Sequence, residues 1–363
     1  MIDRLRADSL ALKAGCEVDL HALRPIPLDT AVKGVSFAYD EEESPGVHHT
    51  QAADVSVLTL NPAVDMTYEV DRILPDQKVH ARATRFDPGG NGINVARALK
   101  RLDIHAHSFC ILAGETGTFL EHLLGQQIDR LTYERVAGDT RINGTVIEHH
   151  TGNQYEVSGV GPHLPKAPLE HLLQHFVASA GNGIGVITGS LQPELPDTLY
   201  ADLVTRIRSF GGRAIVDAQG DLLRHVIEAK PFLIKPNHYE LEQLTGKAID
   251  GIEETAHEAR RLQQDGVENL CVSMGTHGAV LCTPDNSYHA SAPKVKVNST
   301  VGAGDSMVAG LVAGFVHGDT VEQCLCLGVA CGAGTVTHPG TELFAAKEIP
   351  ELMERVTIRP LDI

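Results

Sequence analysis

Tryptophan is absent from the 363-residue chain, and aromatic residues make up only 4% of it. Ligand binding by aromatic stacking is therefore less expected here than close approach of the backbone, for which 35 glycines give scope. No run approaches the roughly 18 apolar residues that span a membrane, and no basic-then-apolar leader opens the chain. We therefore expect a cytoplasmic protein.

Basic residues are scarce relative to acidic ones. Thirty lysines and arginines stand against 47 aspartates and glutamates, for a net charge of −17. This balance argues against a general nucleic-acid-binding protein, whose affinity comes from neutralising phosphates, and a membrane surface is an equally poor partner. The seven cysteines are an odd number without any Cys-x-x-Cys pair. A disulfide framework or a zinc site is therefore not expected.

Residues 1–54 differ in composition from the rest of the chain. A proline-containing stretch, Arg24–Pro27, is followed by the acidic run Asp40–Glu43 and then by Ser44-Pro45-Gly46. Such a succession is typical of an appended segment that ends in a flexible linker. We predict an N-terminal extension over residues 1–54, either a solvated tail or a segment with a role of its own.

From Val55 onwards, short apolar runs rich in β-branched residues alternate with amphipathic helical patterns. The expected strands cover Val55–Leu60, Ser108–Leu112, Gly185–Thr188, Arg213–Asp217, Phe232–Lys235 and Asn269–Ser273. The expected helices cover Asn91–Leu102, Ala201–Phe210 and Glu253–Gln264. Nearly continuous apolar strands between helices indicate a parallel sheet covered on both faces, and right-handed crossovers make a doubly wound α/β fold the default.

Two stretches do not follow that rhythm. Met66–Thr84 and Arg141–Val157 alternate polar and apolar residues. This alternation is typical of exposed antiparallel strands with one face in solvent. We expect a small sheet over the mouth of the larger one, with its strands within about 66–84 and 141–157.

A glycine-rich turn at Ser299–Met307 precedes an apolar helix, Val308–Val316. Two glycines allow the backbone to turn tightly, and free N–H groups at a helix start together with the helix dipole favour an anion. Asp305 falls in the first turn, where its carboxylate is placed to accept a proton from a hydroxyl that attacks phosphate. Taken alone, the motif is equally compatible with a helix-start aspartate and glycines that serve packing.

A second glycine-rich turn, within Asp87–Leu99, opens another amphipathic helix and places Asn94 in its first turn. A dinucleotide fingerprint would need a third glycine where Val95 stands. Thr245-Gly246-Lys247-Ala248 likewise lacks the hydroxyl and the upstream glycine of a phosphate-binding Walker loop. A glycine-rich turn with asparagine instead suits hydrogen bonding to a polyhydroxyl ligand.

Together, the two turns resemble the signatures of one family, the PfkB carbohydrate kinases of the ribokinase-like fold. The resemblance extends from about Val55 to the C-terminus and is closest to the hexose-phosphate branch of phosphofructokinases and tagatose-6-phosphate kinases. It implies an α/β kinase domain over residues 55–363, with a ribokinase-like, mostly parallel sheet flanked by helices and a small β-sheet lid.

The resemblance also implies roles for individual residues. Asp305 would be the catalytic base, beside an anion hole formed by the backbone of Val301, Gly302, Ala303 and Gly304. The implied substrate-binding residues are Asp65, Lys78, Gly89, Gly90, Asn94, Arg141 and Ser190. The implied nucleotide-binding residues are Lys235, Asn237, Ser273, Gly275, Gly278, Gly332 and His338. Asn237 and Glu240 would help to hold Mg²⁺.

The implied reaction is transfer of the γ-phosphoryl group of ATP to a ketohexose phosphate, with ATP as co-substrate, Mg²⁺ as cofactor and K⁺ as a further candidate. Asn91 stands where kinases of sugar 1-phosphates and tagatose 6-phosphate often carry lysine, which favours fructose 6-phosphate. His80 stands where some 6-phosphofructokinases have arginine, which weakens that preference.

Four alternatives follow from the resemblance. Fructose 6-phosphate is the first expectation for the substrate, and fructose 1-phosphate and tagatose 6-phosphate are its rivals. A catalytically silent sugar-phosphate sensor is the remote alternative. The exposed small sheet needs covering, as sheet edges and apolar faces generally do, and the resemblance implies a homodimer through the lid sheet.

Overall fold

The computed structural model describes residues 54–363. The predicted N-terminal extension lies outside the described residues, apart from Asp54. Within the described part of the chain, no helix is long and apolar enough to cross a membrane.

A ten-stranded sheet forms the centre of this part, in the order β14-β13-β12-β11-β10-β9-β8-β1-β4-β5. The strands are β1 (Val55–Thr59), β4 (His107–Ala113), β5 (Arg130–Val136), β8 (Ile184–Thr188), β9 (Arg213–Asp217), β10 (Leu233–Ile234), β11 (Asn269–Ser273), β12 (Ala279–Cys282), β13 (Ser287–Ala290) and β14 (Ile358–Pro360). Neighbours from β5 to β11 pair in parallel, whereas β12, β13 and β14 pair antiparallel.

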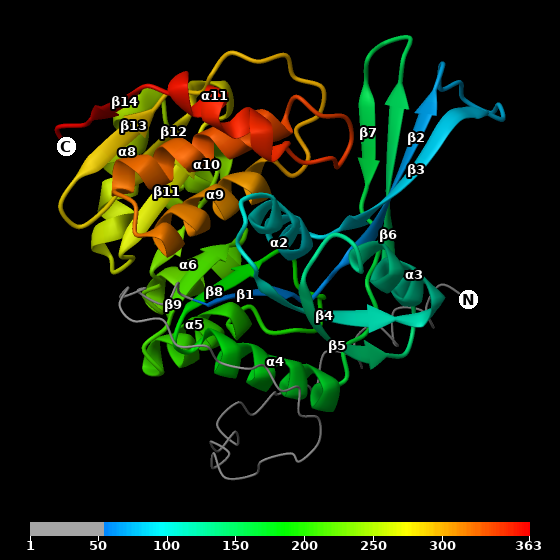
Figure 1. Ribbon diagram of the computed structural model, residues 1–363, viewed down its shortest axis with the longest axis horizontal. Coiled ribbons are helices and arrows are strands. Elements are labelled where there is room, and N and C mark those ends of the chain that lie inside the picture. Colours follow the sequence, from blue (N-terminus) through cyan, green and yellow to red (C-terminus); the bar gives the residue numbers. More distant parts are fainter. Residues whose placement is uncertain (1–53) are drawn as a thin grey trace, which may run out of the picture. The chain divides into compact units, whose positions relative to one another are not determined.

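Helices cover both faces of this sheet (Figure 1). They are α2 (Asn91–Arg101), α3 (Gly114–Leu124), α4 (Lys166–Ala180), α5 (Leu199–Ser209), α6 (Asp221–Glu228), α7 (His238–Thr245), α8 (Gly251–Gln264), α9 (Ala303–His317), α10 (Val321–Thr335) and α11 (Ile349–Glu354). Helices α2, α9 and α10 lie on one side, and α4 and α5 on the other. Every residue of β1 and β8 is buried as a result, which is why both strands are mostly apolar and carry no charged residue.

The predicted doubly wound α/β fold is therefore confirmed, with a mostly parallel sheet and a second, smaller one. The six expected strands occur with ends within two residues of those predicted. The short apolar hairpin β12–β13 and strand β5 were not predicted. The first consists of four-residue strands, and the second carries charged residues at Arg130, Glu134 and Arg135 because it is the edge of the sheet.

The smaller sheet has the strand order β3-β2-β6-β7 and projects beyond the helices in Figure 1. Its strands are β2 (Ala63–Val70), β3 (Ala81–Gly89), β6 (Arg141–Glu148) and β7 (Gln154–Val157). The outer pairs are antiparallel as expected, but β2 and β6 pair in parallel. The reason is topological: β2 follows β1 and β6 follows β5, so both leave the same carboxyl edge of the large sheet in the same direction.

The two faces of the small sheet differ in chemistry. Asp65 on β2 lies opposite Asn143 on β6 and Asp87 on β3, which places these polar side chains on one face. The residues one position along occupy the opposite face, which is apolar and solvent-exposed. These are Phe86 (42% exposed), Ile142 (41%), Tyr155 (44%) and Val157 (70%).

Helices α9 and α10 approach each other closely through glycine. A Cβ atom at Gly310 would lie only 2.8 Å from Gly328 Cα and from Leu327 O. Both contacts are backbone atoms, so neither can rotate away. The position of α9 relative to the rest of the domain therefore depends on the absence of a side chain at Gly310.

We predict that Gly310→Ala lowers the free energy of unfolding by about 1–3 kcal/mol, because the new methyl group overpacks the helix contact. Gly144→Ala is the matched control, since a Cβ at Gly144 would meet nothing within 4 Å. The control is expected to change stability by less than about 0.5 kcal/mol. Urea denaturation of both variants measures the difference, and equal stabilities would contradict the packing argument.

Candidate active site

The carboxylate of Asp305 lies where the N-termini of two helices meet. Gly302 precedes α9 with a left-handed φ of 77°, a backbone conformation that favours glycine, and Asp305 follows in the first turn at 5% exposure. Asn91 Nδ2 donates to Asp305 Oδ1 at 3.0 Å, and Asn94 Nδ2 donates to Oδ2 at 2.9 Å. Both asparagines belong to the first turn of α2, so the two glycine-rich turns of the sequence form one site.

Burial raises the pKa of Asp305 to about 6, and the nearby carboxylate of Asp217 adds to the effect. The hydrogen bonds from Asn94 and Asn91 and the charge of Lys235 act in the opposite direction. The carboxyl group is therefore largely ionised at neutral pH, yet its pKa is far closer to neutrality than that of an ordinary aspartate. Such a pKa suits a general base.

The backbone ahead of Asp305 offers free hydrogen-bond donors. The N–H groups of Gly302, Gly304 and Asp305 donate to no residue within 54–363, as expected for the first turn of a helix. Val301 N already donates to Ser299 Oγ at 3.3 Å and Ala303 N to Thr300 O at 3.4 Å, both long distances. Of the predicted anion-hole residues, Gly302 and Gly304 thus carry the uncommitted donors.

A buried lysine faces the same helix start. A Cβ atom at Gly304 would lie 3.5 Å from Lys235 Nζ, and this ammonium group lies 3.4 Å from Asp217 Oδ1. Burial by itself lowers the pKa of Lys235, but the charges of Asp217, Glu240 and Asp305 outweigh it and the net pKa is raised. Three carboxyl groups surround one lysine, so this cluster carries an excess of negative charge.

Asn237 and Glu240 form the N-terminal cap of α7. Glu240 N donates to Asn237 Oδ1, and Asn237 N donates to Glu240 Oε2, each at 2.8 Å. This reciprocal pair is a capping box, which satisfies two backbone donors that the helix leaves open. Burial raises the pKa of Glu240. The predicted magnesium-binding pair therefore has a structural role in addition to any role in binding.

A cavity of about 380 Å³ lies beside the start of α9. Four of the predicted nucleotide-binding residues line it, namely Ser273, Gly275, Gly278 and Gly332. Gly304 contributes as well, and the remaining wall is largely apolar, including Val295, Val297, Met307, Val329 and Val336. A cavity with apolar walls and a few polar groups at one end is typical of small-molecule sites.

The structure does not bring His338 to this cavity. Its Nε2 lies 3.0 Å from Glu348 Oε2, and its Nδ1 lies 3.8 Å from Glu342 Oε1. Asn237, in contrast, is connected to the cavity, because its backbone pairs with that of Ser273.

Asp65 lies on the polar face of the small sheet at 7% exposure. Asn143 Nδ2 donates to its Oδ1 at 2.8 Å, and burial raises the pKa of the carboxyl group. A Cβ atom at Gly89 would lie 2.2 Å from the same carboxylate, so only glycine leaves it room. The neighbouring Gly90, with a φ of 106°, precedes α2 and connects this group to Asn94.

Arg141 and Ser190 meet at Asn61. Arg141 Nη2 and Nε donate to Asn61 O at 2.8 and 3.2 Å, and Asn61 Nδ2 donates to the exposed Ser190 Oγ at 3.1 Å. Lys78 is exposed in the loop between β2 and β3 and makes no hydrogen bond or ion pair with any residue from 54 to 363.

Sequence reasoning assigned no role to four residues of this site: Asn91, Asn143, Asp217 and Arg97. Asn91 was noted only as a departure from related sequences, although it lies within the first motif. Asn143 follows Arg141 by two positions, which places it on the same side of its strand. Asp217 and Arg97 carry no local pattern that points to this chemistry.

Comparison with known proteins gives a consistent result. Residues 58–348 match the model of the pfkB family carbohydrate kinases. The chain belongs to this family. It is therefore a carbohydrate kinase, that is, a phosphotransferase, and the resemblance inferred from the two signatures is confirmed.

Individual family members match over nearly their whole length. The 1-phosphofructokinase of Bacillus subtilis is 34% identical over 300 residues, which is 82% of this chain and 98% of that protein. The ATP-dependent 6-phosphofructokinase isozyme 2 of Mycobacterium tuberculosis is 33% identical over 302 residues, covering 83% and 89%. The structure of phosphofructokinase-2 from Escherichia coli with substrates and products is similar with a TM-score of 0.80 at 29% identity, covering 83% and 98%.

We predict that the stability of this kinase depends on pH through Asp305. Because the folded-state pKa is raised, the protonated form contributes stability that is lost as pH rises towards 6. Relative to Asp305→Asn, the wild type should lose about 2 kcal/mol of unfolding free energy between about pH 4.5 and about pH 7.5. Urea denaturation at a series of pH values measures this, and a constant difference would contradict the raised pKa.

Proposed function

We propose that the chain is an ATP-dependent phosphofructokinase that phosphorylates fructose 1-phosphate on its 6-hydroxyl to give fructose 1,6-bisphosphate. The observation that carries the chemistry is the buried Asp305 carboxylate, held by two asparagines beside the uncommitted amides of Gly302 and Gly304. The choice of substrate is supported by relatives named 1-phosphofructokinase, including those of Bacillus subtilis and Borreliella burgdorferi.

In this proposal, Asp305 acts as the general base. With a pKa of about 6 it is ionised at neutral pH and accepts the proton of the sugar hydroxyl as that oxygen forms its bond to the γ-phosphorus. The bond from this phosphorus to the bridging oxygen of ATP breaks, and ADP leaves with the electron pair. Asn91 and Asn94 hold the carboxylate through both its oxygens, which fixes its direction before the substrate arrives.

The donors at the start of α9 stabilise the phosphoryl group in transit. The N–H groups of Gly302 and Gly304 would donate hydrogen bonds to the phosphoryl oxygens. The positive end of the α9 dipole lies at the same place and adds to this stabilisation of negative charge. Lys235 adds a positive charge beside Gly304. Positioning and electrostatics of this kind supply most of the acceleration in phosphoryl transfer.

Magnesium suits the surrounding residues. Asp217, Glu240 and Asp305 outnumber Lys235, so a divalent cation would offset the excess negative charge of the cluster. Glu240 and Asn237 supply the hard oxygen ligands that Mg²⁺ prefers, and Mg²⁺ usually keeps several waters and takes one or two carboxylates plus phosphate oxygens. When bound, the ion neutralises charge on the nucleotide phosphates. Potassium stays a further candidate without assigned residues.

The sugar phosphate would bind against the polar face of the small sheet. Asp65, oriented by Asn143, accepts hydrogen bonds from sugar hydroxyls, and Asn94 joins this group to the base. The guanidinium group of Arg141 suits the phosphate already on the sugar because its fork matches phosphate geometry. In this proposal, closure of the sheet excludes water, which otherwise competes as the phosphoryl acceptor.

Fructose 6-phosphate, the first expectation from the sequence, is the second candidate. It is favoured by the 6-phosphofructokinase isozyme 2 of Mycobacterium tuberculosis and by Asn91 in place of lysine. Because several relatives are named 1-phosphofructokinase, we rank fructose 1-phosphate above fructose 6-phosphate. The chemistry at Asp305 is the same for both substrates.

Initial rates of ADP release with fructose 1-phosphate, fructose 6-phosphate and tagatose 6-phosphate test the substrate. We expect the highest kcat/KM for fructose 1-phosphate and a decrease of activity as pH falls below about 6, because Asp305 then becomes protonated. Asp305→Asn should lower kcat by at least roughly 10²–10⁴-fold.

The matched control for this experiment is Asp285→Asn, the same change at an exposed loop position. It is expected to retain wild-type activity. A higher kcat/KM for fructose 6-phosphate than for fructose 1-phosphate would make fructose 6-phosphate the preferred substrate and contradict the first proposal. Absence of turnover with every ketose phosphate would favour the sugar-phosphate sensor instead.

We also propose that a second copy of the chain covers the apolar face of the small sheet. That face is formed by Phe86, Ile142, Tyr155 and Val157, while the polar face carries Asp65 and Asn143. Contiguous exposed apolar side chains of this kind mark interaction surfaces. In a symmetric pair, each copy presents the same face of its own small sheet to the other, so the contact is self-complementary.

Sedimentation analysis of Val157→Asp tests this dimer. We expect the wild type to sediment as a dimer and the variant to dissociate at a protein concentration roughly a hundredfold higher, because a carboxylate must be desolvated in the contact. Phe210→Asp is the control, since Phe210 is 57% exposed but lies at the end of α5, outside the small sheet. Identical sedimentation of all three proteins would reject the contact.

A further inference from the structure

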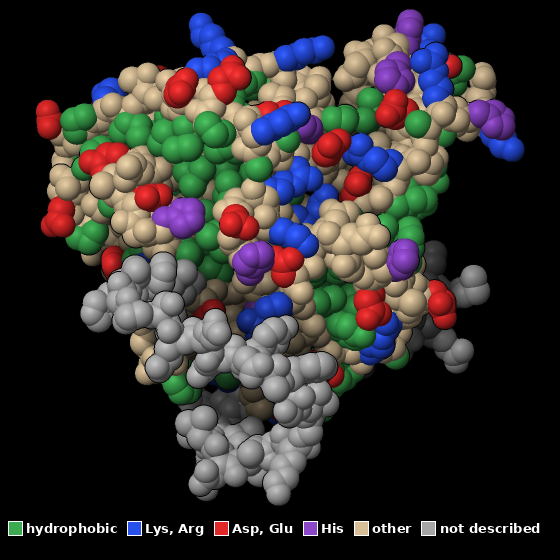
Figure 2. Space-filling view, viewed as in Figure 1, with side chains coloured by type: hydrophobic (Ala, Val, Ile, Leu, Met, Phe, Trp, Pro, Cys, Tyr) green, Lys and Arg blue, Asp and Glu red, His purple; other side chains and the backbone are tan. Residues whose placement is uncertain are grey.

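A second cavity, of about 440 Å³, lies between α2, strand β3 and the segment before η3 (Ala346–Glu348). Of its lining residues, Arg97 contacts the candidate active site through Asn94, and the proposed reaction assigns a role to none of them. Its charged lining consists of Arg85, Arg97, Lys100, Arg101, Asp87 and Glu342. Four cations against two carboxylates give a formal charge of +2, in a protein whose net charge is −17. Figure 2 shows lysine and arginine side chains gathered over this part of the molecule.

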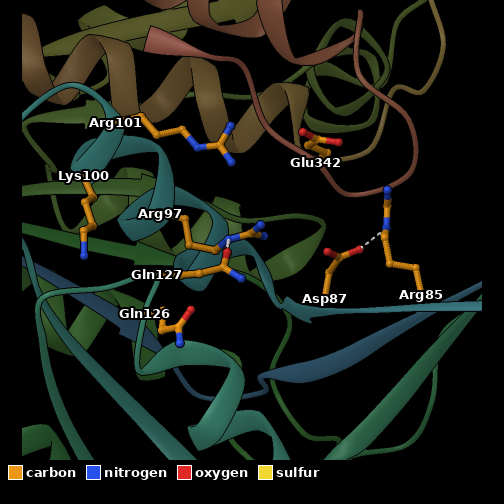
Figure 3. Close-up of a pocket in the computed structure, with 8 residues that line it drawn as sticks. All are labelled: Arg85, Asp87, Arg97, Lys100, Arg101, Gln126, Gln127 and Glu342. Carbon is orange, nitrogen blue, oxygen red and sulfur yellow. Dashed lines mark hydrogen bonds and ion pairs between the residues drawn. The ribbon is translucent and has the colours of Figure 1, made fainter.

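Two of these cations are already neutralised. Arg85 Nε lies 2.7 Å from Asp87 Oδ2, and Lys100 Nζ lies 2.7 Å from Asp129 Oδ1. Figure 3 shows the Nε atom of Arg85 facing Asp87, and the side chain of Lys100 directed away from Arg97 and Arg101. Arg97 and Arg101 are the lining cations left without an ion pair in the described part of the chain. With Glu342 and Asp129 both counted, the cavity keeps a formal charge of +1.

Neither Arg97 nor Arg101 forms an ion pair with a carboxylate of residues 54–363. They are four residues apart on α2, so both guanidinium groups point to the same side, as Figure 3 shows. Like charges at this spacing destabilise a helix. Arg97 is only 4% exposed, and one of its terminal nitrogens, Nη2, donates to no residue within that range.

Burial is costly for a charged group, and it lowers the pKa of Arg97 to about 10, although the charges of Asp87 and Asp65 act in the opposite direction. A protein that retains such an arrangement gains if an anion occupies the cavity. Guanidinium N–H donors match the oxygen geometry of phosphate. Among residues 54–363, Arg97 keeps Nη2 as its uncommitted donor, and Arg101 keeps Nε and Nη2, because its Nη1 donates to the carbonyl oxygens of Leu343 and Phe344.

We propose that this cavity is a regulatory site for a phosphate-bearing small molecule, held by the guanidinium groups of Arg97 and Arg101. Its volume falls in the range of sites for ligands of sugar-phosphate or nucleotide size. Glu342, at the edge of the cavity, disfavours ligands whose charge extends past the two arginines.

The site is joined to the catalytic carboxylate by two consecutive hydrogen bonds. Arg97 Nη1 donates to Asn94 Oδ1 at 3.1 Å, and Asn94 Nδ2 donates to Asp305 Oδ2 at 2.9 Å. Arg97 Nε is held by Gln127 Oε1 at 2.6 Å on the cavity side. An anion that binds the guanidinium group of Arg97 competes with the hydrogen bond from Arg97 to Asn94. Asn94 then holds the Asp305 carboxylate less firmly, so that binding of the anion lowers kcat.

Calorimetric titration with inorganic pyrophosphate in the absence of Mg²⁺ tests binding to the full chain. The titration is repeated with ADP present, to separate this cavity from the nucleotide site. We expect pyrophosphate binding that survives ADP in the wild type and is at least about tenfold weaker in Arg101→Gln, which loses one charge-assisted contact. Arg359→Gln is the control, since Arg359 is an exposed arginine on β14 and should bind like the wild type.

Gln127→Glu is a second variant that preserves the fold. Glutamate keeps the oxygen that accepts from Arg97 and adds a negative charge to the cavity, so pyrophosphate binding should again weaken about tenfold or more. Equal binding by the wild type, Arg101→Gln and Gln127→Glu would overturn the site. Binding that ADP abolishes completely would overturn it as well, because it would belong to the nucleotide site.

A kinetic measurement tests the regulatory part and rests on the proposed kinase activity. At saturating ATP and sugar phosphate with excess Mg²⁺, pyrophosphate should lower kcat of the wild type at least about twofold and leave Gln127→Glu unaffected. An unchanged kcat despite measured binding would overturn regulation. Because the calorimetry needs no turnover, failure of the kinase assignment and failure of this site are distinguishable.

Discussion

The candidate active site is built around one buried carboxyl group. Asp305 sits at 5% exposure, and both of its carboxylate oxygens accept hydrogen bonds from the first turn of another helix. This arrangement requires α2 and α9 to begin at the same place, and it requires the large sheet to bring their N-termini to one edge. The same contacts keep the carboxylate oriented, while burial moves its pKa towards neutrality.

The surroundings of Asp305 follow from that constraint. Gly302 adopts the left-handed φ that the turn before α9 requires, and Gly310 and Gly328 allow α9 and α10 to approach closely. A buried cation, Lys235, offsets part of the negative charge without removing it. The remaining negative charge disfavours a free phosphate anion at this place, and in the proposed function a divalent cation would offset it.

Much of the fold was predictable because the chain carries local patterns for it. Mostly apolar strands such as β1 and β8 indicate burial on both faces, and glycine-rich turns indicate the helix starts of α2 and α9. Strand β5 was missed because an edge strand loses the apolar pattern. The parallel pairing of β2 with β6 was not predicted. Polar–apolar alternation indicates which face of a strand is exposed to solvent, but not whether the neighbouring strand runs parallel or antiparallel.

The sequence by itself determined the α/β class, the two signature turns and the family to which the chain belongs, since each is written in consecutive residues. Only the tertiary structure decided how those residues combine. It joins Asn91 and Asn94 to Asp305 across more than 200 positions, turns Asn237 and Glu240 into a helix cap, and directs His338 to Glu348. Hydrogen bonds and burial between distant segments arise from packing, and no local pattern records them.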